Sequence, residues 1–406
     1  MKEGWENKTL REVCKIRPPK KEAKDRLSEN ELVSFVPMKV LGIEQKYFRA
    51  SENKKLSSVS SSYTYFRDGD VLLAKITPCF ENGKLGIAKE LTNGIGFGSS
   101  EYIVYRTKEI LNNEFLYYFL NQEEFRERGE RQMTGAVGHK RIPKDFYEDT
   151  LIPTPPLSEQ QQIVAILDQA FKAIDQAKAN IEKNINNAKE LFQSKLDAVF
   201  LQKGIDWEEK KLGEIASVEY GYTDKSTTEG DFRYVRITDI DNNGKLVTLD
   251  KKYIKYSKEA EKFILRDEDL LMARTGATFA KLLIYNDFEP SVFASYLIRI
   301  NFQEKIENEL YWYFSKSRYY WQQANNLSSG AAQPHFNGKA LKQVIFSYPK
   351  SIVEQQHLIN TFEGFLNETQ EIEVLYNKKL SNLNELKKAI LQKAFAGELT
   401  NKSVAV

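Results

Sequence analysis

Two stretches of sequence decide the fold of this chain: PPLSEQQQIV at 155–164 and KSIVEQQHLI at 350–359. They share Glu-Gln-Gln at an offset of 195 residues, and each opens a long segment with helical patterning. The same offset relates NEFLYYF (113–119) to NELYWYF (308–314) upstream. Self-similarity at a nearly fixed offset indicates two copies of one fold, each followed by a long helix.

The repeat continues toward the start of each copy with a slowly drifting offset. RDGDVLLAKIT (67–77) matches RDEDLLMARTG (266–276), and WENKTLREV (5–13) matches WEEKKLGEI (207–215). A drift of a few residues is what loop insertions produce in two copies of one fold. The globular parts of both copies are therefore expected to share an architecture.

Each globular part has the pattern of a mixed α+β domain. Runs of β-branched and aromatic residues, bounded by Gly, Asn and Asp, predict strands, and short helices are expected at 113–129 and 308–325. The glycine-rich run GIGFG (94–98) is expected to be a turn. The predicted divisions are a first globular domain at 1–156, a first helix at 157–203, a second globular domain at 204–351, and a second helix with the C-terminal tail at 352–406.

The two long helices have a coiled-coil pattern. Apolar residues recur with a 4-3 spacing, which predicts a hydrophobic seam, and Asn184 and Lys379 hold the same polar position in the two seams. The predicted seam residues are Ile163, Leu167, Ile174, Ile181, Leu191, Leu358, Phe362, Phe365, Ile372, Tyr376 and Leu383. Each helix would be about 60 Å long, which exceeds a domain of this size, so we favour pairing of the helices with each other over packing on their own domains.

Connectivity makes that pair antiparallel, because the first helix must end where the second domain begins and the second helix must return. The predicted fold class is therefore α+β: two similar mixed α/β domains separated by a long antiparallel two-helix coiled coil, with a pseudo-two-fold internal repeat.

Composition narrows the function classes. The chain has 406 residues, 41% hydrophobic and 12% aromatic, which is typical of globular domains, and its net charge of +2 gives no bulk basic signature. Cys14 and Cys79 are the only cysteines, no long apolar run appears, and the first residues lack a secretory h-region. A cytoplasmic protein is expected, and any nucleic-acid surface must be a local patch.

Catalytic constellations are missing from the sequence. The three histidines, His139, His335 and His357, are too scattered for a metal cluster, and no phosphate-binding P-loop is present. The nuclease-like triplets EQK (44–46) and EEK (208–210) do not recur in the other copy. The pattern favours a binding protein with no catalytic residues and no metal site of its own.

The order of these elements resembles the specificity subunit of type I restriction–modification systems. The likeness covers essentially the whole chain, and its most specific parts are the two Glu-Gln-Gln helix starts and the terminal KAFAGELT (393–400). The second copy departs slightly, with one proline, Pro349, before its helix. The resemblance implies two target-recognition domains, a conserved coiled coil, and a non-catalytic role in a methyltransferase and endonuclease complex.

The resemblance also implies partners. Double-stranded DNA would be bound, each recognition domain reading one half of a bipartite, asymmetric target. Two methyltransferase subunits would dock on the helices, and restriction–translocase subunits would join in the full complex. No cofactor is expected on this chain, because S-adenosylmethionine, ATP and magnesium would belong to the partners.

Candidate DNA contacts come from loops at matching places in the two copies. Base edges and phosphates are read by Arg, Lys, Asn, Gln, His and Thr side chains on such loops. The candidates in the first copy are Lys39, Lys75, Thr77, Lys84, His139, Lys140 and Arg141. The candidates in the second copy are Arg236, Thr238, Arg274, Thr275, Lys281, Gln333, His335 and Asn337.

Two other functions stay open from the sequence. A stand-alone DNA-binding protein with a coiled-coil spacer would have the same pattern but would not bind a methyltransferase. An enzyme such as a nuclease or methyltransferase would require a catalytic constellation that the sequence does not display.

Overall fold

The computed structural model describes residues 2–329 and 335–400. The chain divides into two compact units: unit 1 comprises Met1–Asn180 and Lys378–Val406, and unit 2 comprises Ile181–Asn377. Two long helices, α7 (Leu157–Gln202) and α12 (Ile352–Ala396), each contribute residues to both units.

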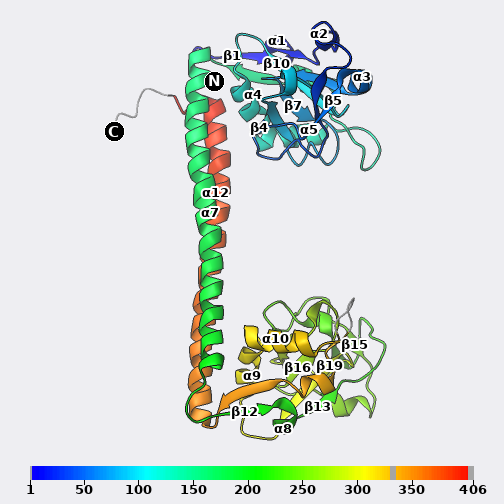
Figure 1. Ribbon diagram of the computed structural model, residues 1–406, viewed down its shortest axis with the longest axis vertical. Coiled ribbons are helices and arrows are strands. Elements are labelled where there is room, and N and C mark those ends of the chain that lie inside the picture. Colours follow the sequence, from blue (N-terminus) through cyan, green and yellow to red (C-terminus); the bar gives the residue numbers. More distant parts are fainter. Residues whose placement is uncertain (1, 330–334, 401–406) are drawn as a thin grey trace, which may run out of the picture. The chain divides into compact units, whose positions relative to one another are not determined.

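Unit 1 contains three sheets, which Figure 1 shows in blue and cyan. The largest has five strands in the order β2 (Cys14–Ile16), β10 (Tyr102–Thr107), β7 (Val71–Ala74), β8 (Leu85–Ala88) and β4 (Tyr47–Phe48). A second has the order β5 (Glu52–Lys55), β3 (Leu32–Val36), β9 (Ile95–Gly98) and β6 (Thr64–Arg67). A third pairs β1 (Glu6–Thr9) with β11 (Leu151–Thr154) in antiparallel register.

Unit 2 repeats this topology with fewer strands. Its main sheet has the order β13 (Ala216–Tyr220), β19 (Leu297–Phe302), β16 (Leu270–Ala273) and β17 (Leu282–Ile284), followed by a sheet of β15 (Tyr253–Ile254), β14 (Phe232–Val235) and β18 (Ser291–Phe293). Strand β12 (Trp207–Lys211) pairs with β20 (Ile345–Pro349) as β1 pairs with β11. The parallel pair β14–β18 matches the parallel pair β3–β9, so the internal repeat extends to strand direction.

Short helices complete both units. Unit 1 has α1 (Leu10–Val13), α2 (Lys21–Lys24), α3 (Leu56–Val59), α4 (Asn113–Leu120), α5 (Glu123–Arg131), α6 (Lys144–Asp149) and the 3₁₀ turn η1 (Thr92–Gly94). Unit 2 has α8 (Leu212–Ile215), α9 (Asn308–Phe314), α10 (Arg318–Leu327), α11 (Gly338–Leu341) and the 3₁₀ turns η2 (Ile237–Asp239), η3 (Ala260–Phe263) and η4 (Gly276–Thr278).

The central strand of each main sheet is buried on both faces. In β7, Val71 and Leu73 pack in the core that contains the helices, whereas Leu72 and Ala74 pack in the core beneath the second sheet. Strand β16 divides its residues in the same alternating way between two cores. Because side chains alternate across a strand, a run of four apolar residues fills both layers and fixes the strand at the centre.

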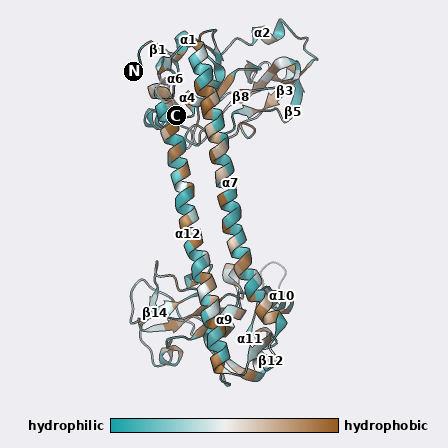
Figure 2. Ribbon diagram, turned by 90° about the vertical axis from the view of Figure 1, so that its left-hand side faces the viewer, coloured by the Kyte–Doolittle hydropathy of each residue, from teal (hydrophilic) through white to brown (hydrophobic). Residues whose placement is uncertain are grey.

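Each unit contains one antiparallel stretch of the helix pair (Figure 1). In unit 1, Ile163, Leu167 and Ile174 of α7 share a core with Leu391 and Ala394 of α12. In unit 2, the later part of α7 packs with the beginning of α12, and the predicted seam residues Leu358 and Phe362 lie in that core. Figure 2 shows hydrophobic residues recurring along both helices among hydrophilic ones.

The predicted seam is wrong at one position. Leu191 is 60% exposed, while the neighbouring Phe192 packs against the unit 2 core; Ile372 is 37% exposed. A strict seven-residue repeat drifts by about 20° per heptad relative to a 3.6-residue helix. Over several heptads that drift moves the buried face, so Phe192 faces the core at the point where the pattern predicts Leu191. The remaining predicted positions Ile181, Phe365, Tyr376 and Leu383 are half-buried.

The repeated Glu-Gln-Gln motif has the same role at the start of each long helix. The side chain of Gln160 is fully buried: its Oε1 accepts from Asn112 N (2.8 Å), and its Nε2 donates to Ile110 O (2.9 Å) and Pro155 O (2.8 Å). Gln355 is also fully buried and makes the matching bonds to Glu307 N, Lys305 O and Pro349 O at 2.9, 3.1 and 2.8 Å. One buried amide thus ties each helix start to the loop before α4 or α9.

The preceding glutamate binds the tryptophan that starts each copy. Trp5 Nε1 donates to Glu159 Oε2 at 3.1 Å, and Trp207 Nε1 donates to Glu354 Oε1 at 2.9 Å. In unit 1, Glu159 also pairs with Lys2 at 2.6 Å and accepts a hydrogen bond from Thr400. The two ends of the described chain therefore meet at one carboxylate.

Both expected mid-domain helices are interrupted. The prediction of one helix at 113–129 gives way to α4 and α5, and that at 308–325 to α9 and α10. Gln122 and Ser317 have extended backbone at these breaks, and the Ser317 hydroxyl caps α10 by accepting from Tyr320 N at 3.1 Å. No helix in the described part of the chain is both long and apolar enough to cross a membrane.

Candidate nucleic-acid interface

In unit 1, the loop after β7 meets a loop from far along the chain. Thr77 N donates to Lys140 O at 2.9 Å, and Ile142 N donates to Lys75 O at 3.0 Å. The sequence candidates Lys75, Thr77, Lys140 and Arg141 are therefore brought together beyond the end of a central strand.

A carboxylate that the sequence reasoning missed lies among these cations. Arg141 donates from Nε and one terminal nitrogen to Glu101, both at 2.9 Å, and Lys75 Nζ lies 3.8 Å from the same carboxylate. The hydrogen bond from Arg141 lowers the pKa of Glu101, so this carboxyl is charged at neutral pH. Burial, followed by the nearby Arg17 charge, lowers the pKa of Lys75. Glu101 offsets part of the positive charge that the sequence predicted here.

The other unit 1 candidates are held in different ways. Lys84 donates from Nζ to Met38 O at 2.8 Å, which places it beside the exposed Lys39. The Thr77 hydroxyl donates to Glu81 Oε1 at 2.7 Å. His139 is exposed in the turn that leads to Lys140. Of this set, Lys39, His139 and Lys140 present the most accessible polar groups.

The backbone of unit 2 repeats this frame around Arg274, the residue that follows β16. Arg274 N donates to Tyr296 O at 3.1 Å, and Phe336 N donates to Arg274 O at 2.9 Å. In unit 1, Lys75 N donates to Glu101 O at 3.0 Å, and Lys75 O accepts from Ile142 N. Arg274 is therefore the structural counterpart of Lys75, and Tyr296 stands where unit 1 has Glu101.

The side chains on the repeated frame differ in chemistry. The guanidinium carbon of Arg274 lies 5.4 Å from the ring centre of Tyr220 and 5.1 Å from that of Tyr296. Its Nε is buried without a hydrogen-bond partner among the described residues. Tyr220 is 41% exposed and Tyr296 is 52% exposed. Neither tyrosine could be found from the sequence, because no motif marks them and their partner is distant along the chain.

Other unit 2 candidates surround Arg274. Thr275 is 5% exposed, and its hydroxyl lacks a hydrogen-bond partner among the described residues. The backbone of His335 pairs with Ser329, and its side chain is exposed. Asn337 caps α11 by accepting from Ala340 N at 2.9 Å. Gln333, also predicted from the sequence, lies outside the described residues.

Three further candidates are engaged in local contacts. Arg236 pairs with Asp239 at 2.9 Å, and Thr238 donates to the same carboxylate at 3.3 Å. Lys281 Nζ donates to Asn242 Oδ1 at 2.8 Å. Turn η2, which carries Thr238, contacts turn η4 next to Thr275, so these loops lie at one end of the main sheet.

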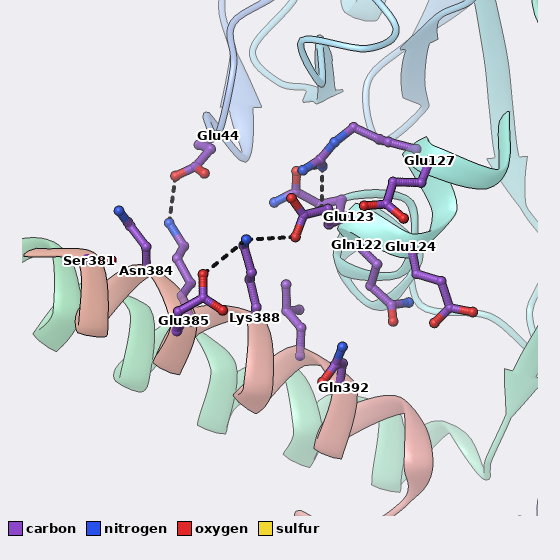
Figure 3. A pocket seen from close by; sticks show the side chains of 14 residues that line it. Glu44, Gln122, Glu123, Glu124, Glu127, Ser381, Asn384, Glu385, Lys388 and Gln392 are labelled. Atoms are coloured by element: carbon purple, nitrogen blue, oxygen red, sulfur yellow. Dashed lines mark hydrogen bonds and ion pairs between the residues drawn. The ribbon is translucent and has the colours of Figure 1, made fainter. Parts of the chain in front are cut away.

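A polar cleft of about 600 Å³ lies between α5 and α12 in unit 1 (Figure 3). Its two lysines are paired: Lys387 binds Glu44 at 2.7 Å, and Lys388 binds Glu123 at 2.8 Å and Glu385 at 3.2 Å. Lys46, just before β4, binds Asp168 of the neighbouring helix α7 at 2.6 Å. These contacts hold the globular part of unit 1 to its two helix segments.

Metal chemistry has no evident site in the part of the chain that the structure describes. No group of three or more His, Cys, Asp and Glu side chains there is placed to hold a metal ion. Both cysteines are free thiols.

Comparison with known families and proteins identifies this architecture. The family model for the type I restriction modification DNA specificity domain matches residues 2–187 and 204–384, one match for each copy. The chain is 40% identical to the specificity subunit of the type I restriction enzyme EcoAI of Escherichia coli over 176 residues. That alignment covers 43% of this chain and 29% of the relative, so only a minor part of that protein is matched.

A second relative aligns over nearly the whole length. The chain is 24% identical to the MjaVIII specificity subunit of Methanocaldococcus jannaschii, covering 99% of this chain and 94% of the relative. Among solved structures, a chain of a type I R-M system superposes with a TM-score of 0.82 at 18% identity, covering 98% of this chain and 99% of that one. The HsdS subunit from Thermoanaerobacter tengcongensis gives a TM-score of 0.65 at 19% identity, with 98% of both chains covered.

Proposed function

The chain belongs to the type I restriction modification DNA specificity family, and on that premise we propose that it selects the DNA sequence on which a methyltransferase and endonuclease complex acts. Each unit reads one half of a bipartite, asymmetric target. The helix pair of α7 and α12 sets the spacer between the halves and docks the methyltransferase subunits.

The observation that carries this proposal is a repeated backbone frame with different side chains. Lys75 and Arg274 are held by equivalent pairs of backbone hydrogen bonds, but one faces a carboxylate and the other two aromatic rings. Sequence is read from base edges by side chains of defined chemistry. Two equivalent frames with different side chains fit two readers of different DNA words.

The partner assignment draws on the repetition of the helix starts. Gln160 and Gln355 make the same three hydrogen bonds, so the two helices begin in the same way on their units. Two equivalently held helix starts suit two copies of one partner. The reaction itself, with its S-adenosylmethionine, ATP and magnesium, is assigned to those partner subunits, acting on cytoplasmic DNA.

Genome-wide mapping of methylated bases tests this proposal. Cells that express the chain with its methyltransferase partner should methylate a split motif with two specified parts and an unspecified spacer, and deletion of the chain should abolish that methylation. A methylation pattern unchanged by the deletion would refute the assignment.

The alternative is a stand-alone DNA-binding protein with a helical spacer. Affinity purification of the full chain from its native cells separates the two functions. Recovery of a methyltransferase at about two copies per chain supports the specificity role. Specific DNA binding without any methyltransferase supports the alternative.

A further inference from the structure

Arg274 differs from every other candidate DNA contact in its surroundings. Its guanidinium lies over the rings of Tyr220 and Tyr296, and among the described residues no hydrogen bond or ion pair engages it. Arg141 of unit 1 and Arg236 of unit 2, by contrast, are each bound to a carboxylate. No carboxylate therefore offsets the charge of Arg274, and its two terminal nitrogens have no hydrogen-bond partner among the described residues, whereas its Nε is buried.

The orientation of Arg274 is fixed from several directions. Its backbone is bonded on one side to Tyr296 O and on the other to Phe336 N. Tyr220 is itself fixed, because its hydroxyl accepts from Gly338 N at 2.8 Å. Aromatic rings that face a guanidinium hold its plane through cation–π attraction. The side chain thus loses little conformational freedom when it binds a partner.

A planar donor group held in this way suits a base edge better than a phosphate. A phosphate contact needs mainly positive charge, which a flexible lysine supplies, whereas two parallel donors in a fixed plane match the O6 and N7 acceptors of guanine in the major groove. We propose that Arg274 reads a guanine in the half-site bound by unit 2, an inference that rests on the proposed function.

Unit 1 has no equivalent reader at this position. Its counterpart, Lys75, donates to Ser100 O at 3.1 Å and lies beside Glu101, which Arg141 also binds. Lys75 lacks the planar two-nitrogen fork of an arginine, its ammonium is already bonded to a carbonyl, and the neighbouring carboxylate offsets its charge. The guanine contact made by Arg274 is therefore specific to one half of the target and contributes to its asymmetry.

The first experiment maps methylated sites in cells that express the full complex with Arg274→Ala. This variant removes the guanidinium donors, and one guanine of the second half-site should become degenerate while the first half-site and the spacer stay unchanged. Arg266→Ala is the matched control, because Arg266 is exposed at the opposite end of β16. Its motif should equal that of the unsubstituted chain.

The outcomes distinguish an incorrect role for Arg274 from an incorrect proposed function. A second half-site without a guanine on either strand, or an unchanged motif in Arg274→Ala, overturns the assignment of Arg274 and leaves the proposed function standing. Absence of any split motif with the unsubstituted chain instead refutes the proposed function.

A second experiment tests the contact directly with the purified complex. Replacing the assigned guanine by 7-deazaguanine removes the N7 acceptor and should weaken specific binding roughly 5- to 150-fold. In Arg274→Ala, the same base replacement should have almost no further effect, because the donor is already gone. Equal losses in both proteins would mean that Arg274 binds elsewhere, for instance to a phosphate, and would overturn the proposal.

Discussion

Trp207 donates its indole N–H to Glu354 Oε1 at 2.9 Å, joining the first strand of unit 2 to the start of the helix that follows its last strand. Trp5 makes the same bond to Glu159 in unit 1. The residue next to each glutamate is the buried glutamine that binds the loop before α4 or α9. Conserving both contacts in both copies explains why Glu-Gln-Gln is the strongest repeated signal in the sequence.

Replacing Gln160 by alanine should destabilise unit 1 by about 2–4 kcal/mol. The change leaves one buried backbone N–H and two buried carbonyls without their hydrogen-bond partner. Each unsatisfied group costs about 1–3 kcal/mol, and a water molecule that enters the cavity and bonds to these groups reduces the total. Urea unfolding measures the loss. The matched control is Gln161→Ala, an exposed neighbour whose side chain has no hydrogen bond among the described residues; similar losses in the two variants would contradict the buried role of Gln160.

Acid should weaken unit 1 through Glu22. Burial raises the pKa of this carboxyl, but hydrogen bonds from Lys15 and Arg106 outweigh it and hold the pKa at about 2. Because the folded pKa lies below the unfolded value of 4.5, the stabilisation is complete above that value and is lost as pH falls from there toward 2.

Urea midpoints measured between pH 6 and pH 2 test this linkage. The urea midpoint of Glu22→Gln should fall less steeply over the acidic range than that of the unsubstituted chain. Asp70 acts in the opposite direction, because burial raises its pKa, so the informative quantity is the difference between the two curves. Glu29→Gln, an exposed change, should leave the slope intact.

Glu101→Gln should strengthen DNA binding by unit 1. The change releases Arg141 and Lys75 from a shared carboxylate. If both cations then contact phosphates, the slope of log K against log salt should steepen by about 1–2. Fluorescence anisotropy with non-specific duplex DNA at several salt concentrations measures both effects. Glu127→Gln, which frees Arg131 on α5, is the control; an unchanged slope in Glu101→Gln would exclude this loop from the interface.

Shortening both long helices together should change the spacer alone. Deletion of residues 181–187 and 374–380 removes one heptad from each helix of the pair, at the level where the side chains of Asn184 and Tyr376 are hydrogen-bonded. Seven helical residues correspond to about 10 Å, or about three base pairs of DNA. Methylation mapping should show the same half-sites with a shorter spacer. Glu182→Ala with Lys183→Ala keeps the helix length and should keep the spacer; altered half-site bases in the deletion would refute the prediction.

The repeat and the helix pair could be predicted because both depend on patterns along the chain. Fine register could not: a strict heptad count marks Leu191, but the helix follows its own 3.6-residue period and buries Phe192 instead.

The prediction of a turn at GIGFG was wrong for a related reason. Residues Ile95–Gly98 form the buried strand β9, and a Cβ on Gly96 would lie 2.2 Å from the Phe66 ring. Glycine is there to admit a neighbour from the adjacent strand, and the sequence does not reveal that neighbour.

The candidate site also has a part that the sequence predicts and a part that it does not. Basic residues on loops after matching strands could be selected from the sequence, and the structure brings Lys75 together with Arg141. The residues that contact these basic side chains are Glu101 in one unit and Tyr220 with Tyr296 in the other, and they come from strands and loops far along the chain. Charge type is visible in sequence, whereas the partner that neutralises or orients a charge depends on tertiary contacts.

The antiparallel pairs β1–β11 and β12–β20 have an evolutionary consequence. In each unit the first strand of the globular part is hydrogen-bonded to the last. The residues between these two strands, which include all the candidate DNA contacts, therefore form an insertion that begins and ends at the same place. A recombination event with crossovers in those two strands would exchange the inserted domain and leave the Glu-Gln-Gln residues that start the following helix unaltered. Under the proposed function, new target sequences arise by replacing whole domains, without re-evolving the assembly that uses them.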